Sequence, residues 1–152
     1  MKCMELNNKL FEIYPNDIIK NFLTNEKELY LEVYPEKISE IALFLNKELG
    51  YPLVSLFAND EREFSGSFAI YYTFSDRNNG FLVILKIMID PQTSNLFLSI
   101  CDKIPAAAAY EREIKDLFGL NPLGHPDPKR LVFHSNWPDE LFPLRKDFDA
   151  KY

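Results

Sequence analysis

Apolar residues in the first third of the chain follow first helical and then strand-like spacing. In residues 1–27 they recur roughly every three to four positions, with a break at Pro15, which predicts a short helical region. Over residues 29–34 apolar side chains alternate with polar or aromatic ones, as expected of a half-buried strand. Residues 35–49 begin with a proline and carry an apolar stripe, which predicts a second helix that Gly50 is suited to end.

Three strand-like runs follow, at residues 51–58, 64–74 and 81–89. The last run is apolar almost throughout, so we expect it to be the central strand. Residues 76–80 end in Asn-Gly, a pair typical of a hairpin turn, and residues 95–100 predict a short edge strand. We therefore predict an α+β fold, a small and mostly antiparallel sheet with helices on one face.

The chain changes character after residue 104. Four consecutive alanines open a predicted amphipathic helix, whose apolar face continues through Tyr110, Ile114 and Phe118 and which Gly119 closes. Acidic and basic residues alternate on its other face, at spacings that allow ion pairs along the helix.

The segment after this helix is rich in both prolines and large apolar residues. Each proline removes a backbone donor, so no long helix or central strand is expected there. The apolar groups of such a segment are expected to be buried against another surface, which is either the chain's own sheet or a partner protein. We predict the second arrangement, a domain of residues 1–119 followed by an extended docking arm of residues 120–152. The prolines are Pro122, Pro126, Pro128, Pro138 and Pro143, and the apolar residues include Leu131, Val132, Phe133, Trp137, Leu141, Phe142 and Leu144.

Composition and charge narrow the class of protein. The net charge is −6 and the sequence pI is about 5.0, which argues against nucleic acid as a partner. No apolar run approaches the roughly 20 residues that span a bilayer, and the first residues lack the layout of a signal peptide. We expect a cytoplasmic protein, for which any membrane association comes through partners.

Metal and cofactor signals are weak in the sequence. Cys3 and Cys101 stand far apart, with no Cys-x-x-Cys motif and no sequence clustering with His125 or His134. Iron–sulfur clusters and structural zinc ions normally take four ligands, and no glycine-rich nucleotide motif is present. We expect this chain to hold no metal and no cofactor.

Three ordered blocks in the last third carry a resemblance to a known family. They are Glu111-Arg112-Glu113-Ile114-Lys115-Asp116-Leu117-Phe118-Gly119, Gly124-His125-Pro126-Asp127-Pro128-Lys129-Arg130-Leu131 and Pro143-Leu144-Arg145-Lys146-Asp147-Phe148. In type and spacing they resemble the 30-kilodalton subunit family of respiratory complex I. That family also occurs in membrane-bound energy-converting [NiFe] hydrogenases and formate hydrogenlyases. Pro128 and Lys129 depart from the family pattern, and Lys129 lacks the planar fork of the usual arginine.

The resemblance implies a non-catalytic docking subunit of an NADH–quinone oxidoreductase or an energy-converting hydrogenase. Its partners would be the large quinone-binding or nickel-bearing subunit and the small iron–sulfur subunit, and any iron–sulfur, nickel or flavin group would lie in them. Residues 133–142 resemble the hydrogenase and formate hydrogenlyase branch more than the complex I branch. When isolated, the chain could form a homodimer by exchanging its arm.

The candidate partner-binding residues lie in these blocks, except Trp137, which lies between the second and the third. Arg130 and Arg145 are expected to pair with partner carboxylates, and Asp116 and Glu113 to hold the helix to the following segment. Trp137 either fills a partner pocket or packs on this chain. The alternative function is a small hydrolase using His125 and Asp127, for which the sequence identifies no nucleophile. The full set is Glu111, Arg112, Glu113, Asp116, Gly124, His125, Pro126, Asp127, Arg130, Trp137, Pro143, Leu144, Arg145, Lys146 and Asp147.

Overall fold

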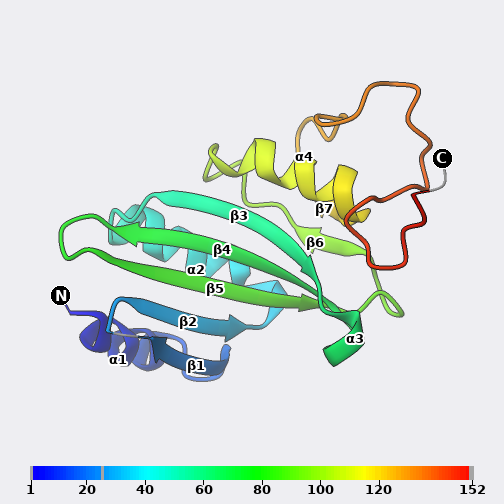
Figure 1. Cartoon of the computed structure of the whole chain (residues 1–152). Helices are drawn as coiled ribbons and strands as arrows, with labels where there is room; N and C mark the ends of the chain where they lie inside the picture. The colour runs from blue at the N-terminus through cyan, green and yellow to red at the C-terminus, as the bar shows by residue number, and fades with distance from the viewer. Residues whose placement is uncertain (1, 25, 151–152) are drawn as a thin grey trace. The chain divides into compact units, whose positions relative to one another are not determined.

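The computed structural model describes residues 2–24 and 26–150 (Figure 1). Its main sheet has five strands in the order β1-β2-β5-β4-β3. β1 pairs with β2 antiparallel and β2 with β5 parallel, and in Figure 1 β4 runs opposite to β3 and β5. The mixed, mostly antiparallel sheet confirms the predicted α+β class. The strands are β1 (Ile18–Thr24), β2 (Glu28–Val33), β3 (Leu53–Asp60), β4 (Phe68–Asp76) and β5 (Phe81–Ile89).

Four α-helices accompany the sheet: α1 (Cys3–Ile13), α2 (Ile38–Leu43), α3 (Arg62–Ser65) and α4 (Ala107–Phe118). The predicted helix over residues 35–49 is divided, because a 3₁₀ turn (Pro35–Lys37) precedes α2 and a π-helical turn (Phe44–Glu48) follows it. None of the helices in the described residues is long and apolar enough to cross a membrane. That all helices cover one face of the sheet stays a prediction.

The helical prediction was wrong for residues 18–24. They form β1, which pairs with β2 from Ile18 opposite Val33 to Thr24 opposite Glu28. Two β-branched residues open the segment, and Phe22 stacks on Tyr30 across the strand pair with ring centroids 4.5 Å apart. Pairing of this kind outweighs the weak helical spacing of the apolar residues.

The hairpin between β4 and β5 is organised by Asp76, whose side chain is buried. Its carboxylate accepts hydrogen bonds from the Asn78 and Asn79 backbone and from the Tyr51 hydroxyl, the last at 2.8 Å. Burial alone would raise the pKa of Asp76, but these donors hold it below its ordinary value. Gly80 follows with φ +72°, which confirms the turn expected at Asn-Gly.

A second, two-stranded parallel sheet joins β6 (Leu96–Leu98) to β7 (Asn121–Leu123). The short strand expected within residues 95–100 is therefore confirmed. β7 was not anticipated, because Pro122 lies at its centre. Proline removes a backbone donor, and in such a short ladder the loss is tolerated. The two strands flank α4 in the sequence, and in space they lie together on one side of it, with β7 in contact with the helix.

By its contacts the chain forms two compact units. Unit 1 comprises residues 1–56 with 71–87, and unit 2 comprises residues 57–70 with 88–152. In unit 1 the fully buried residues include Leu6 and Leu10 of α1 and Leu29 and Leu31 of β2. In unit 2 Phe68 meets Phe118 edge to face at 6.3 Å. The boundary at residues 119/120 stays a prediction.

The structure shows no extended C-terminal arm. Residues 124–150 contain turns and bends without helix or strand, as expected, but they lie against α4 and α3 of their own unit. The arm prediction assumed that one small sheet could not cover so long an apolar segment. In unit 2 the polar face of α4 binds the segment's backbone, so no partner is needed to order it.

Candidate functional site

The polar face of α4 binds backbone groups of the segment that follows it. Arg112 donates from Nε to the Lys129 carbonyl at 2.7 Å and from Nη2 to the Arg130 carbonyl at 2.9 Å. Lys115 donates to the carbonyl of Pro128 at 2.6 Å. These cations satisfy carbonyls that have no strand or helix partner, which is how an irregular segment can be fixed in place.

Asp116 binds the two residues that follow Arg130, and it does so as a hydrogen-bond acceptor, whereas Arg112 and Lys115 are donors. Its carboxylate is 6% exposed and accepts the backbone N–H groups of Leu131 and Val132, both at 2.8 Å. The expectation that Asp116 holds the helix to the following segment agrees with these contacts. Glu113 is exposed on the same helix and makes no such bond in the described part of the chain.

Arg130 binds groups of its own segment and so holds residues 130–139 in a loop. It donates to the carbonyls of His134 and Trp137 and forms an ion pair with Asp139. Trp137 stacks on Phe133 with ring centroids 4.3 Å apart, and its Nε1 donates to the Leu141 carbonyl at 2.9 Å. Trp137 therefore packs within the segment.

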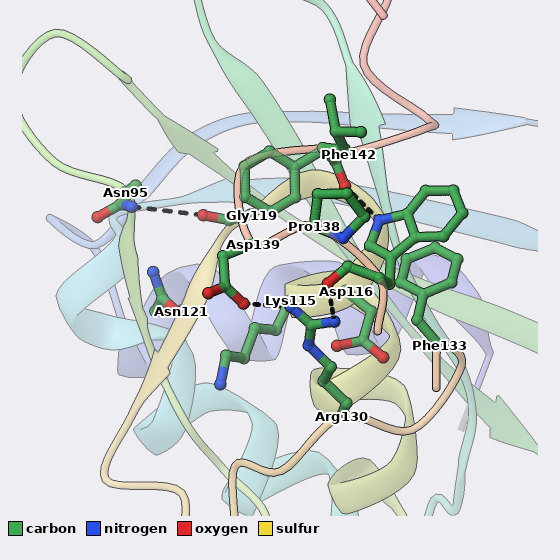
Figure 2. Close-up of a pocket in the computed structure, with 12 residues that line it drawn as sticks. Asn95, Lys115, Asp116, Gly119, Asn121, Arg130, Phe133, Pro138, Asp139 and Phe142 are labelled. Atoms are coloured by element: carbon green, nitrogen blue, oxygen red, sulfur yellow. Dashed lines mark hydrogen bonds and ion pairs between the residues drawn. The ribbon is translucent and has the colours of Figure 1, made fainter. Parts of the chain in front are cut away.

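This loop and the end of α4 enclose a cavity of about 260 Å³ (Figure 2). Figure 2 shows Lys115 and Arg130 in the lower part of the view, Phe142 above them and Phe133 at the right, with Asn121 and Asp139 at the left. Of the charged groups around the cavity, Lys115 donates to a backbone carbonyl, Asp116 accepts backbone N–H groups, and Arg130 and Asp139 pair with each other. A ligand or partner would therefore meet a cavity of defined shape in which these charged side chains already have partners.

The last block closes over the end of α4. The Leu144 N–H donates to the Leu117 carbonyl at 3.2 Å, and Arg145 Nε donates to the Phe118 carbonyl at 2.7 Å. The Arg145 guanidinium also lies over the Phe142 ring, 4.4 Å from its centroid. Burial lowers the pKa of Arg145, and the neighbouring Arg62 lowers it further.

An ion-pair network ties the same block to α3. Arg62 pairs with Asp60 at 2.6 Å and with Asp147 at 2.7 Å, and the Lys146 N–H donates to Asp60 at 2.9 Å. Lys146 also pairs with Glu63 at 2.8 Å. The Arg62 guanidinium holds the pKa of the buried Asp60 well below its usual range.

The histidine of the middle block bonds to backbone groups. One ring nitrogen of His125, Nε2, is 3.1 Å from the Ala108 carbonyl, and the other accepts the Asp127 N–H at 3.0 Å. The Asp127 carboxylate pairs instead with Lys129 at 3.4 Å. His125 and Asp127 therefore do not form the side-chain pair that acid–base catalysis would use.

Sequence spacing missed one cluster in unit 2. Cys101, Glu111 and His125 each offer a ligand atom, and these atoms lie within 4.8 Å of one another. Glu111 is fully buried and accepts hydrogen bonds from Ser99 Oγ at 2.5 Å and the Ile100 N–H at 2.8 Å. Burial raises the pKa of Glu111. Separations of ten and fourteen residues give no metal motif, so only the fold reveals this group.

The predicted site residues differ in the exposure of their side chains, and therefore in how accessible they are to a partner. Glu111 and Asp116 are buried, and six others, Arg112, His125, Arg130, Trp137, Pro143 and Arg145, are half-buried. Those exposed are Glu113, Gly124, Pro126, Asp127, Leu144, Lys146 and Asp147.

Exposed apolar side chains accompany this tightly bonded backbone. Leu131 and Val132 are 45% and 48% exposed although Asp116 binds their N–H groups, and Leu144 is 52% exposed. Phe64 on α3 is 85% exposed, beside Lys146. The sequence pointed to Leu131, Val132 and Leu144 as apolar residues of this segment but not to Phe64, and only the structure shows which of the apolar residues face outward.

The fold and these contacts define a small α+β protein whose C-terminal third is bonded to helix α4. Residues 31–152 match the family model described as "Respiratory-chain NADH dehydrogenase, 30 Kd subunit". The chain therefore belongs to the family of this subunit, and the resemblance predicted from the three blocks is confirmed.

Curated relatives include proteins of hydrogenase and of NADH–quinone oxidoreductase systems. Formate hydrogenlyase subunit 5 of Escherichia coli (strain K12) is 35% identical over 91% of this chain, and Hydrogenase-4 component G of the same organism is 33% identical over 88%. The chain spans 24% of the length of each. An NADH-quinone oxidoreductase subunit of Ruegeria pomeroyi is 29% identical over 90% of this chain, which covers 68% of that protein.

Two solved structures share the fold. A chain of the membrane-bound sulfane sulfur reductase, an archaeal respiratory membrane complex, superposes with a TM-score of 0.83 at 23% identity, covering 97% of this chain and 86% of that one. A trypsin-resistant fragment of Nqo5 superposes with a TM-score of 0.65 at 21% identity, covering 82% of this chain and 98% of the fragment.

Proposed function

We propose that this chain is a non-catalytic docking subunit of a membrane-associated oxidoreductase complex of the complex I or hydrogenase type. It binds the large catalytic subunit and the small iron–sulfur subunit and supports electron transfer coupled to ion pumping. Membership of the 30 Kd subunit family supports this proposal, and so do relatives named as subunits of formate hydrogenlyase and NADH-quinone oxidoreductase.

The observation that carries the proposal is the pairing of a fixed backbone with outward apolar side chains. Leu131 and Val132 are nearly half exposed while their N–H groups are bound by Asp116. A partner that covers them gains the burial of apolar area without ordering the segment, since the segment is already ordered. Exposed apolar groups on a rigid frame are typical of a protein–protein interface.

The relatives' lengths support the choice of a large subunit as the partner. The chain corresponds to about a quarter of formate hydrogenlyase subunit 5 and to 20% of a long NADH-quinone oxidoreductase subunit of Methylococcus capsulatus. It corresponds to 68% of the much shorter subunit of Ruegeria pomeroyi. When one segment occurs both joined to a larger protein and apart from it, the larger portion is its natural neighbour. The partner we propose is the counterpart of that larger portion.

Cofactors and membrane attachment follow from the same proposal. The redox groups, whether iron–sulfur clusters, nickel or flavin, belong to the partner subunits, and this chain itself transfers no electrons. Its place is the cytoplasmic side of the cell membrane, held there by the complex. The likeness of residues 133–142 favours the hydrogenase and formate hydrogenlyase branch, and the match to formate hydrogenlyase subunit 5, at 35% identity over 91% of this chain, is compatible with this branch.

The contacts do not favour a stand-alone hydrolase. The backbone of Asp127, and not its carboxylate, contacts His125, so the acid does not orient the imidazole. No serine or threonine hydroxyl bonds to His125 among the described residues. His125 thus lacks the nucleophile and the orienting group that such a mechanism requires.

Purification of the tagged full chain from native membranes tests the proposal. We expect the large catalytic subunit and the small iron–sulfur subunit to co-purify, identified by mass spectrometry. Changing Leu131 and Val132 together to serine should reduce their recovery at least about tenfold, equivalent to ~1.4 kcal/mol of binding free energy.

A matched control is Ile13→Ser in α1, since Ile13 is also exposed, at 43%, but lies in unit 1. We expect this variant to recover the partners as the wild type does. Both proteins should keep the wild-type melting temperature, because exposed substitutions change stability by about 0.5 kcal/mol or less. A wild-type chain that purifies without a large subunit and hydrolyses esters would overturn the proposal.

A further inference from the structure

Three ligand-type side chains meet inside unit 2. Cys101 follows β6, Glu111 lies in α4 and His125 follows β7, and their ligand atoms all lie within 4.8 Å of one another. Cys101 is 5% exposed, Glu111 is fully buried and His125 is half-buried. Surface carboxylates cluster commonly by chance, but a buried carboxylate beside a thiol and an imidazole is a different arrangement.

We propose that Cys101, Glu111 and His125 bind one zinc ion. Thiolate, imidazole and carboxylate are the three ligand types that zinc takes from proteins. A thiolate disfavours magnesium and calcium, which prefer oxygen ligands throughout. The site has three protein ligands, and Ser99 Oγ is the nearest further donor, 3.2 Å from Cys101 Sγ and 2.5 Å from a Glu111 oxygen. Ser99 or a water takes the fourth position.

The charges of the cluster favour a divalent cation. Glu111 forms no ion pair with any lysine or arginine in the described part of the chain, although it is fully buried. Buried charges are normally paired or bound to a metal. One Zn²⁺ with a thiolate, a carboxylate and a neutral imidazole sums to zero charge. On binding, the Cys101 thiol loses its proton to solvent, and no oxidation or reduction occurs.

The hydrogen bonds around the cluster suit this role. Ile100 N–H and Ser99 Oγ each bond to a different oxygen of Glu111, which leaves lone pairs of both oxygens available. Backbone groups already contact both ring nitrogens of His125. One of these contacts gives way to the ion, and the other continues to orient the ring, as partners of metal-bound histidines do.

The proposed ion is structural. It would join the loop after β6, helix α4 and the turn after β7, which also begins the segment that carries Leu131 and Val132. Binding to the folded chain alone would raise its stability by mass action. The inference does not rest on the docking function, since it concerns side chains inside unit 2.

Zinc binding by the purified full chain, with its tag removed, tests the proposal. After dialysis against Zn²⁺ and then against metal-free buffer, we expect one zinc per chain by elemental analysis and a raised melting temperature. Cobalt(II) added to the metal-free protein should give the charge-transfer absorption of a thiolate ligand. Cys101→Ala should abolish that absorption and weaken zinc binding by more than the roughly 10–100-fold typical of losing a supporting residue.

Cys3→Ala is the matched control, because Cys3 is the other buried cysteine and lies in unit 1. It should bind zinc and cobalt as the wild type does. Should Cys101→Ala fail to fold, the wild-type cobalt spectrum still decides the matter. No retained zinc, cobalt binding without a thiolate band, or equal zinc affinity in the folded Cys101→Ala variant would overturn the proposal.

Discussion

Four carboxylates are buried in the described part of the chain, and their partners differ. Asp76 and Asp116 accept N–H groups of turns and loops, and Asp60 pairs with an arginine. Glu111 accepts hydrogen bonds from Ser99 Oγ and the Ile100 N–H, and like Asp76 and Asp116 it forms no ion pair with an arginine or lysine in the described residues. Since a buried carboxylate without donors costs several kcal/mol, the three aspartates stabilise the local backbone. Glu111 also has donors, but it differs from the aspartates because a thiol and an imidazole lie beside it.

Asp60→Asn should destabilise the protein at neutral pH and make its free energy of unfolding less dependent on pH in the acidic range. The folded-state pKa of Asp60 is depressed by Arg62, so its contribution is present above the unfolded pKa of about 3.9. That contribution is lost as pH falls through the folded value. We expect a loss of about 1.5–3 kcal/mol at pH 7 and a shallower decline of stability below about pH 4, measured by urea unfolding.

Asp102→Asn provides the comparison for this pH experiment. Asp102 is exposed in the same unit and forms no ion pair in the described residues. Its variant should follow the wild-type curve of unfolding free energy against pH. Parallel curves for Asp60→Asn and the wild type would show that the Asp60–Arg62 pair does not stabilise the folded state.

For single residues, the sequence identified which side chains make structural contacts more reliably than it identified the groups that they bind. Asp116 was expected to hold the helix to the following segment, and it does so. Arg130 and Arg145 were expected to seek partner carboxylates, yet both donate to backbone carbonyls of their own unit. A carbonyl acceptor belongs to every residue and leaves no mark in the sequence, so these contacts could not be predicted.

At the scale of elements, the end of α4 shows how a glycine permits a segment to close over a helix. Gly119 has φ +70°, and a Cβ there would lie 2.6 Å from the Phe142 ring and 2.7 Å from Arg145 Nη2. Gly119→Ala should therefore displace residues 142–145 and cost more than the about 1–2 kcal/mol of a left-handed alanine. Faster amide hydrogen exchange at Leu144 and Arg145, with a lowered melting temperature, would report this.

Gly66→Ala is the control that separates the steric clash of an added Cβ from the cost of a left-handed backbone. It has φ +75° in the same unit, but no atom lies within 4 Å of an added Cβ. Gly66→Ala should lose only the left-handed penalty and leave the exchange of Leu144 unchanged. Equal losses in the two variants would mean that Phe142 and Arg145 do not pack on Gly119 in solution.

The bond between α4 and the following segment gives a second prediction at this scale. Asp116→Ala should free the amides of Leu131 and Val132, which we expect to exchange at least about tenfold faster, corresponding to ~1.4 kcal/mol. Glu113→Ala, three residues earlier and exposed, should leave both amides protected. Unchanged protection in Asp116→Ala would show that other contacts hold the segment.

Elements with strong periodicity were predictable, and those set by pairing were not. The helix ending at Gly119 and the hairpin at residues 76–80 carry local signals, a helix-breaking glycine and an Asn-Gly turn. β1 has apolar spacing that also suits a helix, and its state depends on the distant β2. The Cys101–Glu111–His125 cluster depends in the same way on three separate elements.

At the scale of the whole molecule, the main revision concerns residues 120–150. Prolines and apolar groups without regular structure suggested an arm that needs a partner for its order. The structure instead supplies order from charged side chains of α4 and of Asp60 at the end of β3, which bind backbone groups, and from ion pairs with α3. What remains for a partner is the outward apolar surface at Leu131, Val132 and Leu144.

Limited trypsin digestion of the isolated chain distinguishes a folded segment from an arm. The bonds after Lys129 and Arg130 should be cut slowly, because Arg112 binds the carbonyls of both residues and cleavage requires local opening. The bond after Arg77, in the exposed hairpin turn, serves as the internal reference. Arg112→Ala should speed cleavage at residues 129 and 130 and leave cleavage at Arg77 unchanged. If the wild type is cut at Arg130 as fast as at Arg77, or elutes as a dimer joined by exchanged segments, residues 120–150 form an arm after all. Partner binding would then have to supply the order of the segment that presents Leu131 and Val132.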